Sequence, residues 1–258
     1  WSYSTSSFLE SEAARISGHV VDLSEMATVR YTYPLKADIY IRYQGKHQFG
    51  PGSLCHDVIN AVEGWGLCPQ EVYTGLKNGA TKHNHSDMDA ALLATVQALA
   101  KKPSGKLDPS WRSTVDVMLD SYIGELPTKF EYNGRSYTPE SFRDHLGIDP
   151  DNYLNLSSFT HHPFGENFIL EVPDNFSHGE FYNIPIDDLQ RAVEAAVVNG
   201  YTVAWDADVS EKGFSFKHGV AILPKASEMD KLWKEVVEEQ DVTQKSRQVG
   251  FDNQSTTD

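Results

Sequence analysis

The sequence WSYSTSSFLESEAARI occupies residues 1–16 and predicts a helix that begins at the first residue. Apolar residues recur at roughly helical spacing, and small Ser and Thr residues fill the other side. These apolar positions are Trp1, Phe8, Leu9, Ala13 and Ile16. A helix needs groups that satisfy its first N–H groups, and nothing ahead of Trp1 supplies such a cap. We therefore expect the chain to start within an element, on a helix that packs closely against its surroundings.

The composition is that of an acidic globular protein. Of its 258 residues, 40% are hydrophobic and 11% aromatic, which is enough to bury a large core in one domain or in two lobes. The 22 Lys and Arg against 37 Asp and Glu give a formal net charge of -15. A field of this sign repels phosphate backbones and anionic membrane surfaces, so we expect no nucleic-acid binding. No apolar run approaches the roughly 20 residues needed to cross a bilayer, so we expect no membrane insertion.

The sequence leaves the cellular location of the protein open. It shows no signal peptide, but a chain that starts within an element leaves export undecided. The sequence is compatible with a cytoplasmic protein and equally with a bacterial periplasmic or exported protein. Cys55 and Cys68 flank a predicted helix and could be a free pair or one disulfide, and two thiols do not define a compartment.

Caps, turn residues and apolar spacing predict helices in the first half and strands mainly toward the end. The predicted helices after the first cover about 24–33, 35–43, 53–62, 86–101, 109–123, 138–147, 185–199 and 227–240. The predicted strands are a hairpin at 130–137 with Asn-Gly at its turn, and residues 153–159, 167–172, 201–205 and 220–223. Pro34 is expected to interrupt the second helix. This order predicts an α+β fold.

One loop carries a cluster that resembles a metal-ligand set. His83, His85, Asp87 and Asp89 lie within the sequence KHNHSDMD. Neutral imidazoles and carboxylates that converge could bind a metal ion. The simpler interpretation is a polar loop that leads into a helix, where Asp in the first turn complements the helix dipole. We favour the simpler interpretation and predict no metal or other cofactor.

Three other positions could carry chemistry. His161 and His162 precede Pro163 in a turn, where they could hold loops by side-chain bonds or act in catalysis. Asp206 and Asp208 follow a predicted buried strand, where they are either solvated carboxylates or a binding or acid-base pair. Cys55 is either a half-buried helix residue or a nucleophile, and the sequence places no activating His beside it. The simpler interpretation is preferred in each case.

Several motifs together resemble those of papain-like cysteine peptidases. The stretch WSYSTSSFLESE is similar to the sequence that follows the catalytic Cys of that family, whose pattern is C-W-[SA]-[FY]-[SA]. DLSE at residues 22–25 resembles the family's L-S-E-Q, and GPGS at 50–53 resembles its glycine loop beside the substrate cleft. The stretch from Tyr182 to Val209, which contains YNIPI and WDADV, looks like the bleomycin hydrolase and aminopeptidase C branch.

The resemblance implies a particular organisation of the chain. Residues 1–258 would form one papain-like peptidase domain that is incomplete at both ends. Residues 1–75 would be the helical lobe, 76–180 a large and mostly helical insertion typical of the branch, and 181–258 the start of the β-rich lobe. The expected fold is thus the two-lobed papain-like form of an α+β protein.

The resemblance also implies where the chemistry lies. The catalytic Cys would immediately precede Trp1 and the catalytic His would closely follow Asp258. Trp1 and Asp258 would therefore flank the site, and no catalytic residue would lie within 1–258. Gly50, Gly52, Ser53 and Asp206 are the expected substrate-binding residues. The missing side chains of the two glycines would let a substrate backbone approach.

The expected function is that of a cysteine peptidase, specifically an aminopeptidase, with peptide substrates. The alternative is a non-catalytic peptide-binding protein that keeps the same fold but lacks the flanking Cys or His. Members of the branch often form ring-like oligomers, so the resemblance is compatible with a homo-oligomer.

Overall fold

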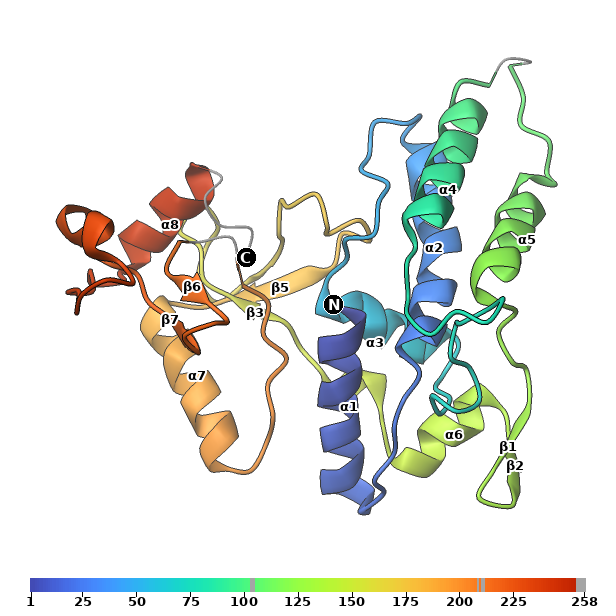
Figure 1. Ribbon diagram of the computed structural model, residues 1–258, viewed down its shortest axis with the longest axis horizontal. Coiled ribbons are helices and arrows are strands. Elements are labelled where there is room, and N and C mark those ends of the chain that lie inside the picture. Colours follow the sequence, from blue (N-terminus) through green and yellow to red (C-terminus); the bar gives the residue numbers. More distant parts are fainter. Residues whose placement is uncertain (103–104, 208, 210–211, 254–258) are drawn as a thin grey trace. The chain divides into compact units, whose positions relative to one another are not determined.

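The computed structural model describes residues 1–102, 105–207, 209 and 212–253 (Figure 1). The chain divides into two compact units. Unit 1 contains residues 1–155, 169–180 and 195–204, and unit 2 contains residues 156–168, 181–194 and 205–258. Helices dominate unit 1 and short strands are concentrated in unit 2, so the predicted α+β class is confirmed.

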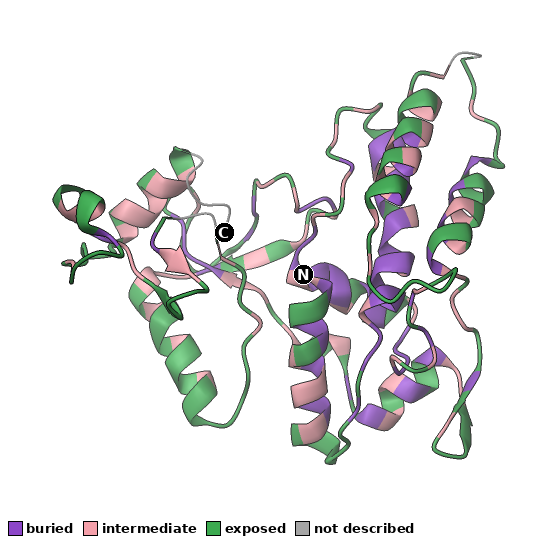
Figure 2. Cartoon of the chain, viewed as in Figure 1, coloured by how far each residue is buried: buried purple, intermediate pink, exposed green. Residues whose placement is uncertain are grey.

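Unit 1 is built from helices that alternate with loops. The helices are α1 (Ser2–Ser17), α2 (Glu25–Arg42), α3 (Cys55–Gly64), α4 (Ser86–Ala100), α5 (Trp111–Ile123), α6 (Pro139–Leu146) and the 3-10 helix η1 (Pro150–Asn152). Helix α2 packs against α1, α3, α4 and α5, which makes it the centre of the unit. Figure 2 shows that its surface is largely buried, as is that of α3.

The prediction that Pro34 breaks the second helix is wrong. Helix α2 continues through Pro34 from Glu25 to Arg42. A proline in a helix interior removes one backbone hydrogen bond, which costs about 3 kcal/mol in an isolated helix. Here the turns on both sides of Pro34 are buried, with Tyr33 and Ala37 fully in the core. The packing of neighbouring helices therefore outweighs the local cost.

The predicted hairpin is confirmed. Strand β1 (Phe130–Tyr132) pairs antiparallel with β2 (Arg135–Tyr137). Asn133 and Gly134 have φ angles of 50° and 73°, the left-handed values that a type I′ turn needs at both positions. Thr138 then caps α6 by accepting a hydrogen bond from the Ser141 N–H. The Asn-Gly turn and the helix predicted at 138–147 therefore both agree with the structure of this region.

Unit 2 contains a three-stranded sheet with the order β3 (Leu156–Ser157), β5 (Glu180–Asn183) and β4 (Asn167–Ile169). Strands β3 and β5 are parallel. A hairpin of β6 (Phe214–Ser215) and β7 (Val220–Ala221), the helix α7 (Ile186–Val198), the 3-10 helix η2 (Ala226–Lys231) and the helix α8 (Gln244–Asp252) follow in the sequence. Helix α7 has no buried residue (Figure 2).

Phe159 is the centre of the small core of unit 2. Its side chain is fully buried, and its ring lies 4.5 Å from the ring of Phe251 on α8. The Arg247 guanidinium stacks over the same ring at 4.5 Å. The fully buried Asn183 donates to the carbonyls of Phe159, His162 and Pro163. This single amide therefore fixes the turn that carries the two histidines.

Two elements predicted in the last third are wrong. Residues 201–205 do not form a strand, and Trp205 is 80% exposed. A strand needs a neighbour for its N–H and C=O groups, and the described residues provide no ladder for this segment. The helix predicted at 227–240 is only the 3-10 helix η2 at 226–231. Conversely, α8 was missed, although Thr243 caps it through the Ser246 N–H.

Among the described residues, none of the helices is both long and apolar enough to cross a bilayer. The division of the sequence at residues 75 and 180 describes a correspondence with a family and stays a prediction. In the structure, α4, α5 and α6 belong to the same compact unit as α1, α2 and α3.

Candidate active site

The N-terminal end of α1 lies against the loop of residues 50–53, which we call the glycine loop. The indole Nε1 of Trp1 donates a hydrogen bond to the Pro51 carbonyl at 2.9 Å. Trp1 is the residue that precedes the first turn of α1, and its side chain is half-buried. Two motifs that lie 50 residues apart in the sequence are therefore in direct contact.

Lys36, on the central helix α2, reaches the same loop from the protein interior. Its Nζ donates to the Gly50 carbonyl at 2.9 Å and also to the Gly52 carbonyl. Lys36 is only 2% exposed. The sequence interpretation did not identify this residue, because a Lys in an amphipathic helix is usually solvated. The only local indication that Lys36 is buried is that neighbouring residues of α2 are buried too.

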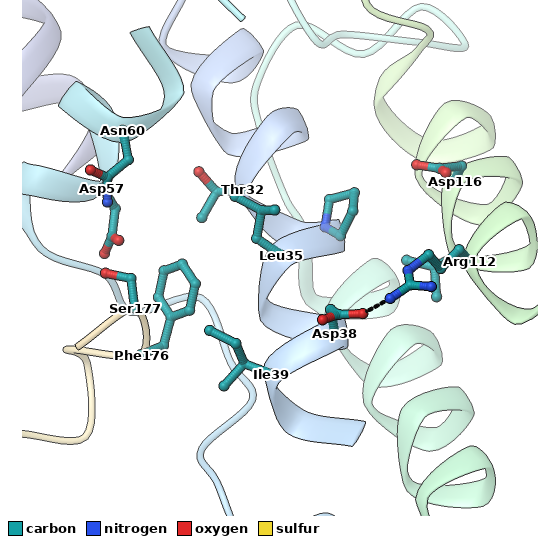
Figure 3. A pocket seen from close by; sticks show the side chains of 12 residues that line it. Thr32, Leu35, Asp38, Ile39, Asp57, Asn60, Arg112, Asp116, Phe176 and Ser177 are labelled. Carbon is teal, nitrogen blue, oxygen red and sulfur yellow. Dashed lines mark hydrogen bonds and ion pairs between the residues drawn. The ribbon is translucent and has the colours of Figure 1, made fainter. Parts of the chain in front are cut away.

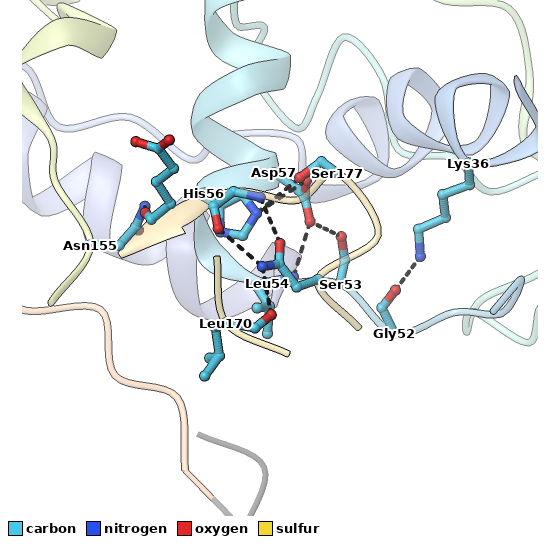
Figure 4. A network of polar contacts seen from close by, with 12 residues as sticks. Lys36, Gly52, Ser53, Leu54, His56, Asp57, Asn155, Leu170 and Ser177 are labelled. Carbon is cyan, nitrogen blue, oxygen red and sulfur yellow. Dashed lines mark hydrogen bonds and ion pairs between the residues drawn. The ribbon is translucent and has the colours of Figure 1, made fainter. Parts of the chain in front are cut away.

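Burial lowers the pKa of the Lys36 ammonium to about 8, while the carboxylates of Asp57, Asp174 and Asp89 act in the opposite direction. Desolvation disfavours the charged form of a lysine, and nearby negative charges favour it. The ammonium is therefore still largely protonated at neutral pH. Figure 4 shows it pointing from α2 toward the Gly52 carbonyl.

The two glycines of the loop have different surroundings. Gly50 has open space where a side chain would start. At Gly52 the carboxylate of Asp174 fills that space, and this carboxylate accepts a hydrogen bond from Gln48 at 2.8 Å. Gly50 therefore offers the open approach that a substrate backbone would need. Gly52 lets the Asp174 side chain pack against the loop.

Ser53 is buried and faces α3 (Figure 4). The sequence predicts that this helix begins at Ser53, but the N-cap is Leu54. Instead, Asp57 in the first turn accepts hydrogen bonds from the Ser53 hydroxyl at 2.6 Å and from the Leu54 N–H at 3.2 Å. A carboxylate at this position also complements the helix dipole. Ser53 thus anchors the end of the glycine loop to α3.

A second buried group, His56, ties α3 to the loop of residues 170–179. Its Nε2 lies 2.9 Å from the Ser177 hydroxyl and 3.6 Å from Asp57 Oδ1. Burial lowers the pKa of His56, and the negative charge of Asp57 opposes this shift. Asn175, which belongs to the same loop as Ser177, also forms a hydrogen bond with the His56 imidazole and opposes the lowering of its pKa. The arrangement therefore serves to hold the loop.

Asn175 completes the same loop from within. Its side-chain NH₂ donates to the carbonyls of Leu170 and Gly179, both at 3.0 Å, and its oxygen accepts from the Gly179 N–H at 2.8 Å. These bonds position Asp174 and Phe176, which flank Asn175 on either side. The sequence interpretation missed this role, because a single Asn in a loop carries no distinctive pattern.

A cavity of about 490 Å³ lies beside this network (Figure 3). Side chains of α2, α3 and α5 line it together with Phe176 and Ser177. The Arg112 guanidinium and the Asp38 carboxylate form an ion pair on its wall. The lining includes Asp57 but no residue of the glycine loop, so the cavity is separate from that loop.

The remaining predicted positions lie elsewhere. His83 and His85 have ring centroids 5.5 Å apart, but Asp89 accepts a hydrogen bond from Tyr33, and no third ligand joins the two rings within the described part of the chain. Asp87 is in the first turn of α4, as the simpler interpretation expected. Asp206 is exposed outside regular structure. Asp208 and Asp258 lie outside the described residues.

The histidines of unit 2 pack against aromatic rings. The His161 ring stacks on Phe251 at 5.3 Å, and the His162 ring stacks on Phe168 at 4.6 Å. The loop here is held by the Asn183 side chain, and His161 Nδ1 adds a contact with Gln248.

The two cysteines do not form a disulfide with each other, since Cys68 is a buried free thiol. Burial raises the pKa of this thiol to about 12. Cys55 is half-buried at the start of α3, in agreement with the simpler interpretation of its position.

Comparisons with known proteins point to peptidases of lactobacilli. The chain is 24% identical over 181 residues to aminopeptidase G of Lactobacillus delbrueckii subsp. lactis, covering 61% of this chain and 41% of that protein. Its fold is similar to the crystal structure of PepW from Lactobacillus rhamnosis HN001, with a TM-score of 0.54 and 15% sequence identity. That match covers 74% of this chain and 52% of the PepW chain. No protein-family model matches.

Proposed function

We propose that this chain is part of a papain-like cysteine peptidase, most closely an aminopeptidase of the bleomycin hydrolase type. The hydrogen bond from Trp1 to Pro51 carries the proposal, because it joins the end of α1 to the glycine loop. In the family that the motifs resemble, these are the two features on either side of the nucleophile. The similarity to aminopeptidase G supports the class of reaction, and the chain spans 41% of the length of that relative.

The proposed nucleophile is a Cys that immediately precedes Trp1 in the full-length protein. At this place its thiol would sit at the N-terminus of α1, whose dipole favours the negatively charged thiolate. A His beyond Asp258 would remove the proton from the thiol and later protonate the leaving amine. No metal or organic cofactor takes part in this mechanism.

The substrate would lie along the glycine loop. At Gly50 the absence of a side chain leaves open space, so an extended peptide backbone can come close to the chain. Lys36 and Trp1 hold the loop through hydrogen bonds to its carbonyl groups. Asp206 is proposed as a further substrate contact on the basis of the resemblance, and Asp258 as a neighbour of the catalytic His.

The test uses the full-length gene product and a vinyl sulfone that reacts with activated thiols. We expect rapid labelling of one Cys next to Trp1, loss of labelling when that Cys is replaced by Ala, and hydrolysis of peptides that have a free N-terminus. Peptides with a blocked N-terminus should react at least about tenfold more slowly if the enzyme is an aminopeptidase. A residue other than Cys before Trp1 would contradict the mechanism. Peptide binding without labelling or hydrolysis would instead support the non-catalytic binding protein.

A further inference from the structure

Three consecutive carbonyl groups of the glycine loop are held by two side chains. The Lys36 ammonium donates hydrogen bonds to the carbonyls of Gly50 and Gly52. The Trp1 indole donates to the carbonyl of Pro51 between them. A loop whose successive peptide units are each fixed has little freedom left, because every bond restrains a different pair of backbone dihedral angles.

The ammonium of Lys36 lies inside the protein, where the loss of hydration costs free energy. Three aromatic rings surround the Nζ atom, with centroids at 5.0 Å for Phe176, 5.7 Å for Tyr33 and 5.9 Å for Trp1. Rings at this range attract a cation through their negative faces. Even so, burial dominates the shift that lowers the pKa of this lysine. An apolar residue would avoid this penalty, but it would leave the carbonyls of Gly50 and Gly52 without the donor that Lys36 supplies.

The charged groups around Lys36 come from several elements. Asp57 lies on α3, Asp89 lies on α4, and Asp174 lies on the loop that faces Gly52. The titratable Tyr33 comes from α2 itself, and burial raises the pKa of its phenol. Lys36 is thus the common neighbour of the first helix, the glycine loop and the loop of residues 170–179. A change at this one side chain acts on all three.

We propose that Lys36 is a positioning residue, which together with the Trp1 indole holds the backbone of the glycine loop in the conformation that binds a peptide. This inference rests on the proposed function for its substrate. The buried Lys36 and the half-buried Trp1 hold the carbonyls of the loop, while the space at the Cβ position of Gly50 is open and Pro51 is exposed. Lys36 therefore acts through the loop and does not touch the reacting atoms.

The experiment compares Lys36→Met with the wild type in the full-length gene product. Met is apolar and similar in length, so it fills the space but donates no hydrogen bond. We expect KM for a peptide to rise about tenfold or more, with kcat changed less than about threefold, since binding along a loop away from the reacting bond is mostly uniform binding. Lys46→Met, which alters an exposed lysine in the preceding loop, is the matched control and should leave both constants unchanged.

A second variant tests the loop from its other anchor. Trp1→Phe keeps an aromatic ring but removes the N–H that binds Pro51. If the two side chains hold one loop, the double variant should raise KM by less than the product of the single effects. Equal KM values in wild type and Lys36→Met, with both proteins folded by circular dichroism, would overturn the proposal. Trp1→Phe supplies the same comparison if Lys36→Met does not fold.

Amide hydrogen exchange tests the role of Lys36 independently of the proposed peptidase activity. The buried Leu54 N–H, which donates to Asp57, reports on the end of the glycine loop. In Lys36→Met it should exchange about tenfold faster at a fixed pH, whereas in Lys46→Met it should not change. An accelerated exchange in a protein without peptidase activity would refute the peptidase while supporting the role of Lys36. Unchanged KM in a protein that has peptidase activity, whether or not exchange changes, would refute the role of Lys36 alone.

Discussion

The carboxylate of Asp174 occupies the space in which a Cβ atom on residue 52 would stand. Gly52 therefore packs against the protein itself, while Gly50, two residues earlier, has no heavy atom within 4 Å of the same position. Neither residue has a φ angle in the left-handed region, so alanine can adopt both backbone conformations. Replacing each glycine by alanine therefore gives two matched variants, which differ mainly in the atoms that the added methyl group contacts.

Gly52→Ala should destabilise the protein by about 1 kcal/mol, because the methyl group displaces the Asp174 carboxylate from its bond with Gln48. Urea unfolding measures this change. Asp174→Ala removes the obstacle, so adding Gly52→Ala to Asp174→Ala should cost little further. An equal cost of Gly52→Ala in both backgrounds would show that the obstacle is something other than Asp174.

Gly50→Ala should leave the free energy of unfolding within about 0.5 kcal/mol of the wild type, because its methyl group points into open space. If a substrate backbone approaches this glycine, the same methyl group should raise KM for a peptide about tenfold or more. Steady-state kinetics of the full-length protein checks this expectation. A variant with unchanged KM would place the substrate away from Gly50.

The contact between α1 and the glycine loop could be anticipated from the sequence, but only through a resemblance. The helical spacing of apolar residues predicts α1 itself. The structure agrees, because Leu9 and Ala13 are fully buried. The spacing of apolar residues in the two segments does not predict that Trp1 contacts Pro51. That contact depends on how two elements distant in sequence pack, and the motifs indicated it because they recur together in one family.

The buried polar residues were beyond what the sequence could show. Lys36, His56 and Asp57 each occupy a position where a solvated side chain is the usual outcome. Their burial depends on α2 being covered on several sides by other helices. The same tertiary packing explains why α2 continues through Pro34, against its local propensity.

Cys68 should not react with thiol reagents in the native protein. Its side chain is buried, and burial raises the pKa of the thiol to about 12, so the reactive thiolate is scarce near neutral pH. Titration with a chromogenic disulfide at pH 8 should detect Cys68 only after denaturant is added. Cys68→Ala should leave vinyl sulfone labelling of the full-length protein unchanged. Loss of labelling in this variant would identify Cys68 as the labelled residue and contradict the proposed nucleophile.

Lys36 should make the stability of the protein depend on pH in a defined direction. Its pKa is about 8 in the folded state, against a reference value of 10.5 for an unperturbed lysine. Between these two values the unfolded state binds more protons than the folded state, so the free energy of unfolding gains a contribution that rises with pH. Well below pH 8 both states are protonated and the contribution is constant.

Comparison with Lys36→Met isolates this contribution, because all other titrating groups are shared by the two proteins. From pH 7 to pH 9.5 the wild type should gain about 2 kcal/mol of stability relative to Lys36→Met, as measured by urea unfolding at each pH. Lys46→Met should follow the wild type, since Lys46 is exposed. A difference between wild type and Lys36→Met that stays constant over this range would mean that the ammonium of Lys36 is not desolvated. The buried position of its side chain among Trp1, Tyr33 and Phe176 would then have to be wrong.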